Sequence, residues 1–254
     1  TGFDYETPYL FVSGGANGLE IYSSPELVYT TLVESRNLPY RVNGMSLVNG
    51  TLATVQENGQ VHLLDVRTPS VPLPTESWKV PGIPVATVAL RSSLHIASRF
   101  VGLITYRLLV GAVEWIHTVY RAFELVALEP LGEDGLVGLD TQRGLFVWQV
   151  DEQGIPTLAA ELPDICNGPC VSLFVTDSTA WVVSQSGVLP VDLSQSGAPV
   201  PGVLYLNVGL GEPHNVAVQN SKLAISYQSI ASGKSYLEAV SVLQGGAYES
   251  LGFA

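Results

Sequence analysis

Six glycines recur along this chain, at positions 18, 59, 102, 144, 187 and 233, with intervals of 41 to 46 residues. Each glycine stands between two short apolar runs, as Gly59 does between Thr51–Gln56 and Gln60–Val66. A repeat of about 42 residues built from strands and glycine turns is typical of a β-propeller blade. The chain is therefore predicted to be all-β: a six-bladed β-propeller with four antiparallel strands in each blade.

The repeat places all 254 residues in one propeller domain. Its units run near residues 8–48, 49–91, 92–131, 132–175, 176–219 and 220–254, with an additional N-terminal strand. Gly2–Glu6 is expected to supply the innermost strand of the first blade, and Tyr248–Phe253 the outermost strand of the last. The two ends of the chain would then meet and close the ring. A truncated or open array is the alternative, because terminal repeats need their apolar faces covered.

Turn residues define the strands best in the second blade. Asn58-Gly59 between two apolar runs is a strong hairpin signal, because both turn positions favour positive φ. The four strands are predicted at Val42–Val48, Thr51–Gln56, Gln60–Val66 and Thr75–Val80. The third blade lacks such a turn, and its β-branched residues predict a hairpin through Gly111 rather than a helix. Pro190 lies inside a predicted strand and is expected to weaken it.

Two segments are similar to a known repeat. Gln60–Pro72 and Gly187–Ser194 each contain an apolar strand that ends in Asp, and in the first it runs into a turn with Ser and Pro. They resemble the LVIVD-type propeller repeat, whose spacing all six units share, although the first, third and sixth blades lack the Asp. The resemblance implies an exported or cell-surface protein, because that family occurs largely in such proteins of bacteria and archaea. It implies no particular chemistry.

Composition limits the classes of partner. Hydrophobic residues make up 46% of the chain and charged residues 13%, yet no run of about 20 uninterrupted apolar residues predicts a membrane-spanning helix. The apolar strands instead fit blades that are covered on both faces. The net charge of −12 disfavours binding to nucleic acid or to an anionic membrane surface.

The two cysteines, Cys166 and Cys170, flank an Asn-Gly-Pro turn that would bring their sulfurs together. We expect a disulfide; an inert thiol pair, or redox or metal chemistry, is the alternative. Two cysteines without a neighbouring histidine are too few ligands for a structural zinc site. A disulfide favours an oxidising compartment. Since the chain also begins at Thr1, we expect an extracellular or cell-envelope protein whose signal peptide has been removed.

No motif identifies a catalytic centre. His62, His95 and His117 are interpreted as strand residues on blade surfaces, and none has the spacing of metal ligands. The acidic pair Glu133 and Asp134 supplies too few oxygens for calcium, and Asp134 is interpreted as a turn residue. We therefore expect neither a metal ion nor a cofactor.

One group of residues suggests a binding site. Alignment of the units places polar and cationic residues on the loops that lead into the innermost strands, around the mouth of the central channel: Tyr40, Arg41, Asn43, Arg121, His214 and Asn215. In a chain of net charge −12 these residues would form a local positive site for a carboxylate or an acidic sugar, with bidentate contacts from arginine. The alternative is that each arginine pairs with a neighbouring glutamate in solvent.

The sequence thus predicts a non-catalytic, exported binding or scaffolding module that contacts other proteins or surface polymers through its loops. Two alternatives stay open. One is a hydrolase or lyase that acts on a sugar or lactone at the channel mouth, which would require titratable groups with perturbed pKa values there. The other is a structural subunit of a surface assembly or filament that self-assembles through its edge strands.

Overall fold

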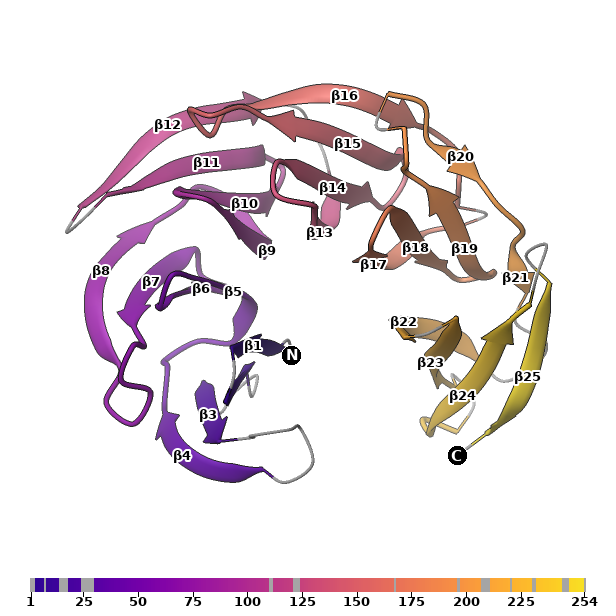
Figure 1. The fold of residues 1–254 in the computed structure, drawn as a ribbon, viewed down its shortest axis with the longest axis horizontal. Helices are drawn as coiled ribbons and strands as arrows, with labels where there is room; N and C mark the ends of the chain where they lie inside the picture. Colours follow the sequence, from indigo (N-terminus) through magenta and orange to yellow (C-terminus); the bar gives the residue numbers. More distant parts are fainter. Residues whose placement is uncertain are drawn as a thin grey trace. The chain divides into compact units, whose positions relative to one another are not determined.

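The computed structural model describes the chain except for residues 1–2, 7, 14–17, 24–29, 110–111, 121–123, 167, 196, 207–210, 220, 230–231, 244–246 and 254. In the described residues every regular element is a β-strand, and the strands form six separate antiparallel sheets (Figure 1). Within each sheet neighbouring strands follow one another in sequence, except that the last, short strand of the fifth sheet pairs with the third strand and not with the fourth. The fold is a six-bladed β-propeller, as the repeat predicts.

The first three blades contain four strands each. Blade 1 comprises β1 (Phe3–Glu6), β2 (Tyr9–Ser13), β3 (Leu19–Ser23) and β4 (Thr31–Arg36). Blade 2 comprises β5 (Val42–Val48), β6 (Thr51–Gln56), β7 (Gln60–Asp65) and β8 (Leu73–Lys79). Blade 3 comprises β9 (Ile83–Leu90), β10 (Ser93–Arg99), β11 (Gly102–Leu109) and β12 (Ala112–Tyr120).

The last three blades follow the same plan. Blade 4 comprises β13 (Leu125–Leu131), β14 (Gly135–Asp140), β15 (Gly144–Val150) and β16 (Pro156–Leu162). Blade 5 comprises β17 (Cys170–Thr176), β18 (Thr179–Ser184), β19 (Gly187–Asp192), β20 (Val200–Pro201) and β21 (Tyr205–Leu206). Blade 6 comprises β22 (Glu212–Gln219), β23 (Lys222–Gln228), β24 (Ser235–Val242) and β25 (Tyr248–Phe253).

The strand predictions agree closely with these sheets. The first two strands predicted for blade 2 are confirmed at both ends, and the other two differ by one or two residues at their ends. The third blade contains the predicted hairpin of β11 and β12, whose turn at Gly111 lies outside the described residues. The terminal strands are also confirmed, since β1 pairs with β2, and β25 pairs with β24.

Pro190 weakens the outer edge of blade 5. It keeps its place in β19, opposite Trp181 of β18. On the other side the outer strand is divided: β20 pairs with Val191 and Asp192, and β21 pairs with Gly187 and Val188. Proline has no N–H to donate to an outer strand. Its carbonyl oxygen accepts a hydrogen bond from the backbone N–H of Gly202 at 2.8 Å, between the two pieces.

The six repeat glycines all have positive φ, between +66° and +153°. Two of them show why glycine is required. A Cβ atom at Gly144 would lie 2.3 Å from the carbonyl oxygen of Leu162, and one at Gly187 would lie 1.9 Å from that of Tyr205. Both carbonyls belong to the outer strand of the same blade, so glycine allows that strand to lie close to the start of its neighbour.

The innermost strands of blades 2 to 6 each contain a bulge. The register shifts leave one residue in each strand without a partner on the next: Asn43, Val85, Val126, Val171 and His214. A bulge bends the strand and redirects a side chain. Asn43 and His214, both candidate site residues, therefore occupy the same structural position in blades 2 and 6.

The chain divides into two compact units. The first, Thr1–Phe123 with Glu152–Ile155, contains blades 1 to 3, and the second, Glu124–Asp151 with Pro156–Ala254, contains blades 4 to 6. Within each unit the apolar core lies between adjacent blades. The prediction of one closed domain concerns the arrangement of the two units and stays a prediction.

The loop between β16 and β17 is closed by the predicted disulfide. Cys166 and Cys170 are bonded, with Cα atoms 5.6 Å apart. Cys170 is buried in the core between blades 4 and 5, and its backbone N–H donates to the carbonyl oxygen of Thr141 at 3.1 Å. The disulfide therefore fixes the start of the innermost strand of blade 5.

Candidate binding groove

Each blade has two ends that carry loops. We call the end at which the innermost strand begins the upper end, and the opposite end the lower end. In blade 2 the upper end carries Arg41 and the turn Glu57–Gly59, and the lower end carries the turn between β5 and β6. The sequence predicted a site at the upper ends, whereas the structure shows hollows at the lower ends of blades 1 to 3.

The larger hollow, of about 400 Å³, opens between blades 2 and 3. Its floor is the open end of the apolar core that joins these blades, because Leu63, Leu108 and Val113 belong to both. The turns that follow β5 and β9 form part of its rim. A concave site of this size with an apolar floor and a few polar groups is typical of ligand pockets. We call it the lower-end groove.

Four charged side chains line the groove: Asp65, Arg67, Glu76 and Arg91. Asp65 and Arg67 neutralise each other, since Nε of Arg67 lies 3.0 and 3.1 Å from the two carboxylate oxygens and Nη2 also donates to Oδ2. The Arg67 guanidinium lowers the pKa of Asp65 to about 2. In the part of the chain that the structure describes, no ion pair holds Glu76 or Arg91.

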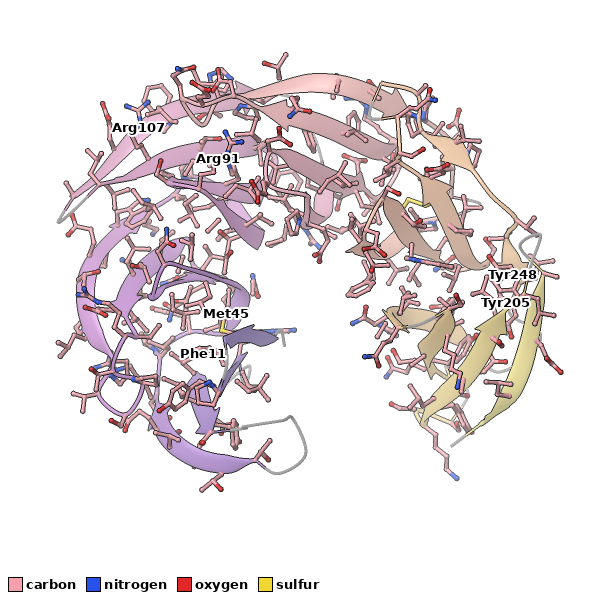
Figure 2. The ribbon with its side chains drawn as sticks, in the orientation of Figure 1. Phe11, Met45, Arg91, Arg107, Tyr205 and Tyr248 are labelled. Carbon is pink, nitrogen blue, oxygen red and sulfur yellow. A yellow bond between two sulfur atoms is a disulfide. The ribbon has the colours of Figure 1, made fainter. Side chains whose placement is uncertain are left out.

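Arg91 has an unusual backbone conformation. It is the first residue of the two-residue turn between β9 and β10, with φ +53° (Figure 2). The same turn position holds Asn49 in blade 2 and Asp177 in blade 5, with φ +50° and +51°. Asn and Asp tolerate this left-handed conformation, whereas a long side chain seldom adopts it. Blade 3 therefore carries a strained arginine on the rim of the groove.

A second hollow, of about 340 Å³, lies between blades 1 and 2 and shares Asn49 and Arg67 with the groove. Tyr9, Phe11 and Pro69 line its apolar wall. Gly50 makes room for the stem of Arg67, because a Cβ atom there would lie 2.5 Å from Cγ of that arginine. The Arg67 side chain therefore forms the ridge between two adjoining hollows.

The chemistry of the groove suits recognition rather than proton transfer. Arginine stays protonated in proteins, and Asp65 is held ionised by Arg67. Glu76 and Arg91 present one negative and one positive group beside an apolar floor. Among the described residues, no group of three or more His, Cys, Asp or Glu side chains is placed to hold a metal ion. Nor do the described residues contain a helix long and apolar enough to cross a membrane.

His95 was predicted at a blade surface, and this is wrong. It is 0% exposed in β10, with Nε2 2.9 Å from Oγ of Ser93 and Nδ1 3.0 Å from Oγ1 of Thr105. The Ser93 hydroxyl donates to the carbonyl oxygen of Leu90, so it accepts the proton of Nε2–H, and Thr105 donates to Nδ1. Burial lowers the pKa of His95 to about 4. The neutral ring is thus held within blade 3, close to the Arg91 turn.

Three residues of the predicted site lie in blade 2. Tyr40 and Arg41 are exposed at the upper end, and the carbonyl oxygen of Arg41 accepts a hydrogen bond from the backbone N–H of Glu57. Asn43 donates from Nδ2 to the carbonyl oxygen of Pro84 at 2.8 Å. This bond joins the innermost strands of blades 2 and 3, so Asn43 has a structural role.

Two of the other predicted residues, His214 and Asn215, lie in blade 6. His214 is exposed on β22, and Oδ1 of Asn215 accepts a hydrogen bond from Oγ of Ser172 at 3.0 Å, which joins blades 5 and 6. Arg121 lies outside the described residues. Because blades 2 and 6 belong to different units, convergence at a channel mouth stays a prediction.

Sequence reasoning missed a buried carboxylate between blades 5 and 6. Glu238 of β24 is 3% exposed and accepts hydrogen bonds from the hydroxyls of Tyr205 at 2.6 Å and Tyr227 at 2.7 Å. Burial and the bond to Glu238 both raise the pKa values of the two tyrosines. Tyr248 packs on Tyr205, with ring centroids 5.1 Å apart (Figure 2). No motif marks this cluster, because its members are far apart in sequence.

Sequence reasoning also missed the lower-end groove, although one signal was available. Alignment of the β5–β6, β9–β10 and β17–β18 turns reveals that Arg91 stands where blades 2 and 5 have Asn49 and Asp177. A residue that breaks the local preference of a turn is a candidate for function. This alignment requires the end of each strand to be located to within one residue, and the structure supplies those ends.

Comparison with known proteins identifies the fold alone. No model of a protein family matches the chain, so the LVIVD-type resemblance stays a prediction, and no curated protein matches it either. Among solved structures, a β-propeller domain of Cps50 (Swd1) from Myceliophteria thermophila is 11% identical, with a TM-score of 0.74, covering 100% of this chain and 86% of that one. Sqt1 from Saccharomyces cerevisiae is 12% identical, with a TM-score of 0.66 and coverages of 95% and 81%.

Two further structures give the same result. A protein of unknown function from Desulfotomaculum acetoxidans is 10% identical, with a TM-score of 0.74, and the match covers 100% of this chain and 80% of that one. The computationally designed protein Ika8 is also 10% identical, with a TM-score of 0.71 and coverages of 100% and 73%. At such identities the likeness extends to the β-propeller architecture and not to function.

Proposed function

We propose that this chain is a binding module that holds a segment of another protein in the lower-end groove. The observation that carries the proposal is Arg91: a strained arginine, without an ion pair in the described residues, on the rim of a hollow with an apolar floor. Strained backbone is concentrated at functional sites because the fold there serves something other than stability.

The groove defines what such a segment should contain. An apolar side chain would enter the open core end at Leu63, Leu108 and Val113. A carboxylate beside it would pair with Arg91, to which the guanidinium offers a bidentate contact. A basic group would face Glu76. A polypeptide supplies all three groups at neighbouring positions, which supports a protein ligand over a small metabolite.

We also propose that the module acts outside the cytoplasm. The disulfide between Cys166 and Cys170 supports this location, because disulfides persist mainly in oxidising compartments. The net charge of −12 would help to keep the module soluble there.

The test uses a displayed library of random twelve-residue peptides, selected on the purified chain. We expect the enriched peptides to share an apolar residue next to an acidic one. Binding should weaken by about ten-fold or more in Arg91→Asn, the loss expected for one charge-assisted contact. Ser92→Trp should weaken it similarly by filling the rim of the groove.

The matched control is Ser178→Trp, at the same turn position in blade 5. It introduces the same side chain away from the groove and should leave binding unchanged. Enriched peptides that bind all three variants equally well would exclude the groove as the site. Failure to enrich any peptide over an unrelated propeller would refute the proposed function.

A further inference from the structure

The upper end of blade 3 exposes an aromatic residue in a strained conformation. Phe100, in the turn between β10 and β11, has φ +67° and is 72% exposed. A bulky residue with positive φ is an outlier, and the turn gains nothing from burying the ring. The glycine of this turn is present in both blades, as Gly59 in blade 2 and Gly102 in blade 3, and both have positive φ, so the positive φ of Phe100 is additional to it. The position of Phe100 therefore has no explanation in the stability of the blade.

Other apolar and cationic side chains lie at the same end. Arg99, next to Phe100, pairs with Ile83 across the β9–β10 register, and Ile83 is 43% exposed. The bond from Asn43 to Pro84 joins the start of β5 to the start of β9, so the upper ends of blades 2 and 3 adjoin. Tyr40, 48% exposed, and Arg41 precede β5 there. We call Tyr40, Arg41, Ile83, Arg99 and Phe100 the upper-end patch.

The charge of the patch is not neutralised by the described residues. No ion pair there involves Arg41 or Arg99, and Nε of Arg99 is buried without a hydrogen-bond partner. Glu57, whose backbone N–H bonds to the carbonyl of Arg41, is an exposed acid at this end, yet no ion pair joins it to Arg41 in the described structure. Two arginines with two aromatic rings have the composition of protein-binding hot spots.

We propose that the upper-end patch is a second interaction surface, which binds an acidic segment of a protein partner. Phe100, Tyr40 and Ile83 would contact apolar side chains of that segment, and the two arginines its carboxylates. The occupant follows from charge: the patch carries two cations in a chain of net charge −12. Because the patch and the lower-end groove lie at opposite ends of the same strands, one can fail its test while the other passes.

The test measures binding of a fluorescein-labelled ten-residue peptide of alternating glutamate and leucine, with a lysine–leucine peptide for comparison. Because this peptide also has the composition proposed for the ligand of the lower-end groove, every chain tested, the reference included, carries Ser92→Trp, which fills the rim of that groove. We expect the glutamate peptide to bind more tightly than the lysine peptide, and more weakly as salt is added. Phe100→Asn and Arg41→Ser should each raise its dissociation constant about ten-fold. Asn accepts positive φ, so Phe100→Asn should fold and have an unchanged or higher melting temperature.

Val71→Asn is the matched control, since Val71 is 57% exposed at the lower end of blade 2 and lies outside the patch. It should leave the dissociation constant unchanged. Equal affinity for the two peptides, or a glutamate peptide that binds the Phe100→Asn variant as well as the Ser92→Trp reference, would overturn the proposal. Complete displacement of the peptide by heparin at equal charge concentration would also overturn it, by showing a general anion surface.

Discussion

Two contacts between neighbouring blades each contain a glutamate, which is buried in one contact and lines an open groove in the other. Between blades 5 and 6, Glu238 is buried and accepts hydrogen bonds from Tyr205 and Tyr227. Between blades 2 and 3, Glu76 lies on the wall of the lower-end groove, and no ion pair holds it among the described residues. Two positions along from Glu76, Trp78 packs on Tyr106 of blade 3, with ring centroids 5.1 Å apart.

The difference shows how a repeated fold separates stability from recognition. A buried carboxylate is tolerated where donors from both blades satisfy it, and the contact between blades 5 and 6 is then closed. Between blades 2 and 3, Glu76 has no such donors among the described residues and stays at the surface, and the apolar core there ends in the lower-end groove. The closed contact should respond to mutation with a loss of stability, and the open one with a loss of binding.

The largest effect is expected from removing both donors to Glu238. The double variant Tyr205→Phe and Tyr227→Phe leaves a buried carboxylate without its hydrogen bonds, which should cost about 3–5 kcal/mol of unfolding free energy. Urea denaturation followed by tryptophan fluorescence would measure the loss. Adding Glu238→Leu should recover most of it, because an apolar residue then replaces the unpaired charge. A double variant as stable as wild type would show that Glu238 is not held by these tyrosines.

The second effect is a loss of stability in acid caused by His95. Its pKa is lowered to about 4 in the folded chain from an unfolded value of 6.5, because burial disfavours the charged ring. Between pH 6.5 and pH 4, His95 therefore binds a proton in the unfolded chain and stays neutral in the folded chain. Stability from this group is complete above pH 6.5 and falls as the pH approaches 4, by about 3 kcal/mol.

The measurement is the unfolding free energy of wild type and His95→Gln between pH 7 and pH 4. Subtracting the two curves isolates His95 from the carboxylates that also titrate in acid, including Asp65. His95 belongs to blade 3, so its protonation should weaken that blade without breaking the bonds of Glu238. A difference curve that is flat with pH would contradict the buried, neutral ring.

The sequence predicted the strands well because strand and turn signals are local. Six glycines with positive φ and the Asn58-Gly59 turn fix where strands begin, and the alternation of apolar runs fixes their number. The disulfide was predictable for the same reason, since its cysteines flank one turn. Alignment of the repeats also placed Asn43 and His214 together, at the entry to the innermost strands, and in the structure the two occupy equivalent bulges.

The sites were not predictable because they depend on contacts between blades. Asn43 and Asn215 are polar loop residues in the sequence, yet both form hydrogen bonds to a neighbouring blade. Glu238 and Tyr205 are 33 residues apart, and the sequence around each residue does not predict their hydrogen bond. Whether a glutamate is buried and satisfied, or exposed on a groove, depends on the facing blade rather than on its own strand.

A third prediction makes the same substitution at both glutamates. Glu76→Leu places an apolar side chain beside Leu63 and Val113, and partial burial there should add about 1–2 kcal/mol of stability. Glu238→Leu alone leaves the hydroxyl of Tyr227, which is 1% exposed, without its acceptor and should cost about 1–3 kcal/mol. Chemical denaturation of the two variants measures the sign of the change in unfolding free energy for each. Equal signs would show that the two contacts do not differ in the way described.

The smallest effect distinguishes function from strain at the Arg91 turn. Replacing Arg91 by Asn gives blade 3 the residue that blade 2 has at φ +50°, and should raise the unfolding free energy by about 0.5–1 kcal/mol. The reverse change, Asn49→Arg, should lower it by a similar amount. Thermal melts of the two variants resolve shifts of this size, about 1–4 °C for a chain of this length. If Arg91→Asn gains stability while it loses peptide binding, the strain at this turn is maintained for the ligand. If it loses stability instead, Arg91 is a structural residue of blade 3, and the open contact with blade 2 is a packing defect rather than a site.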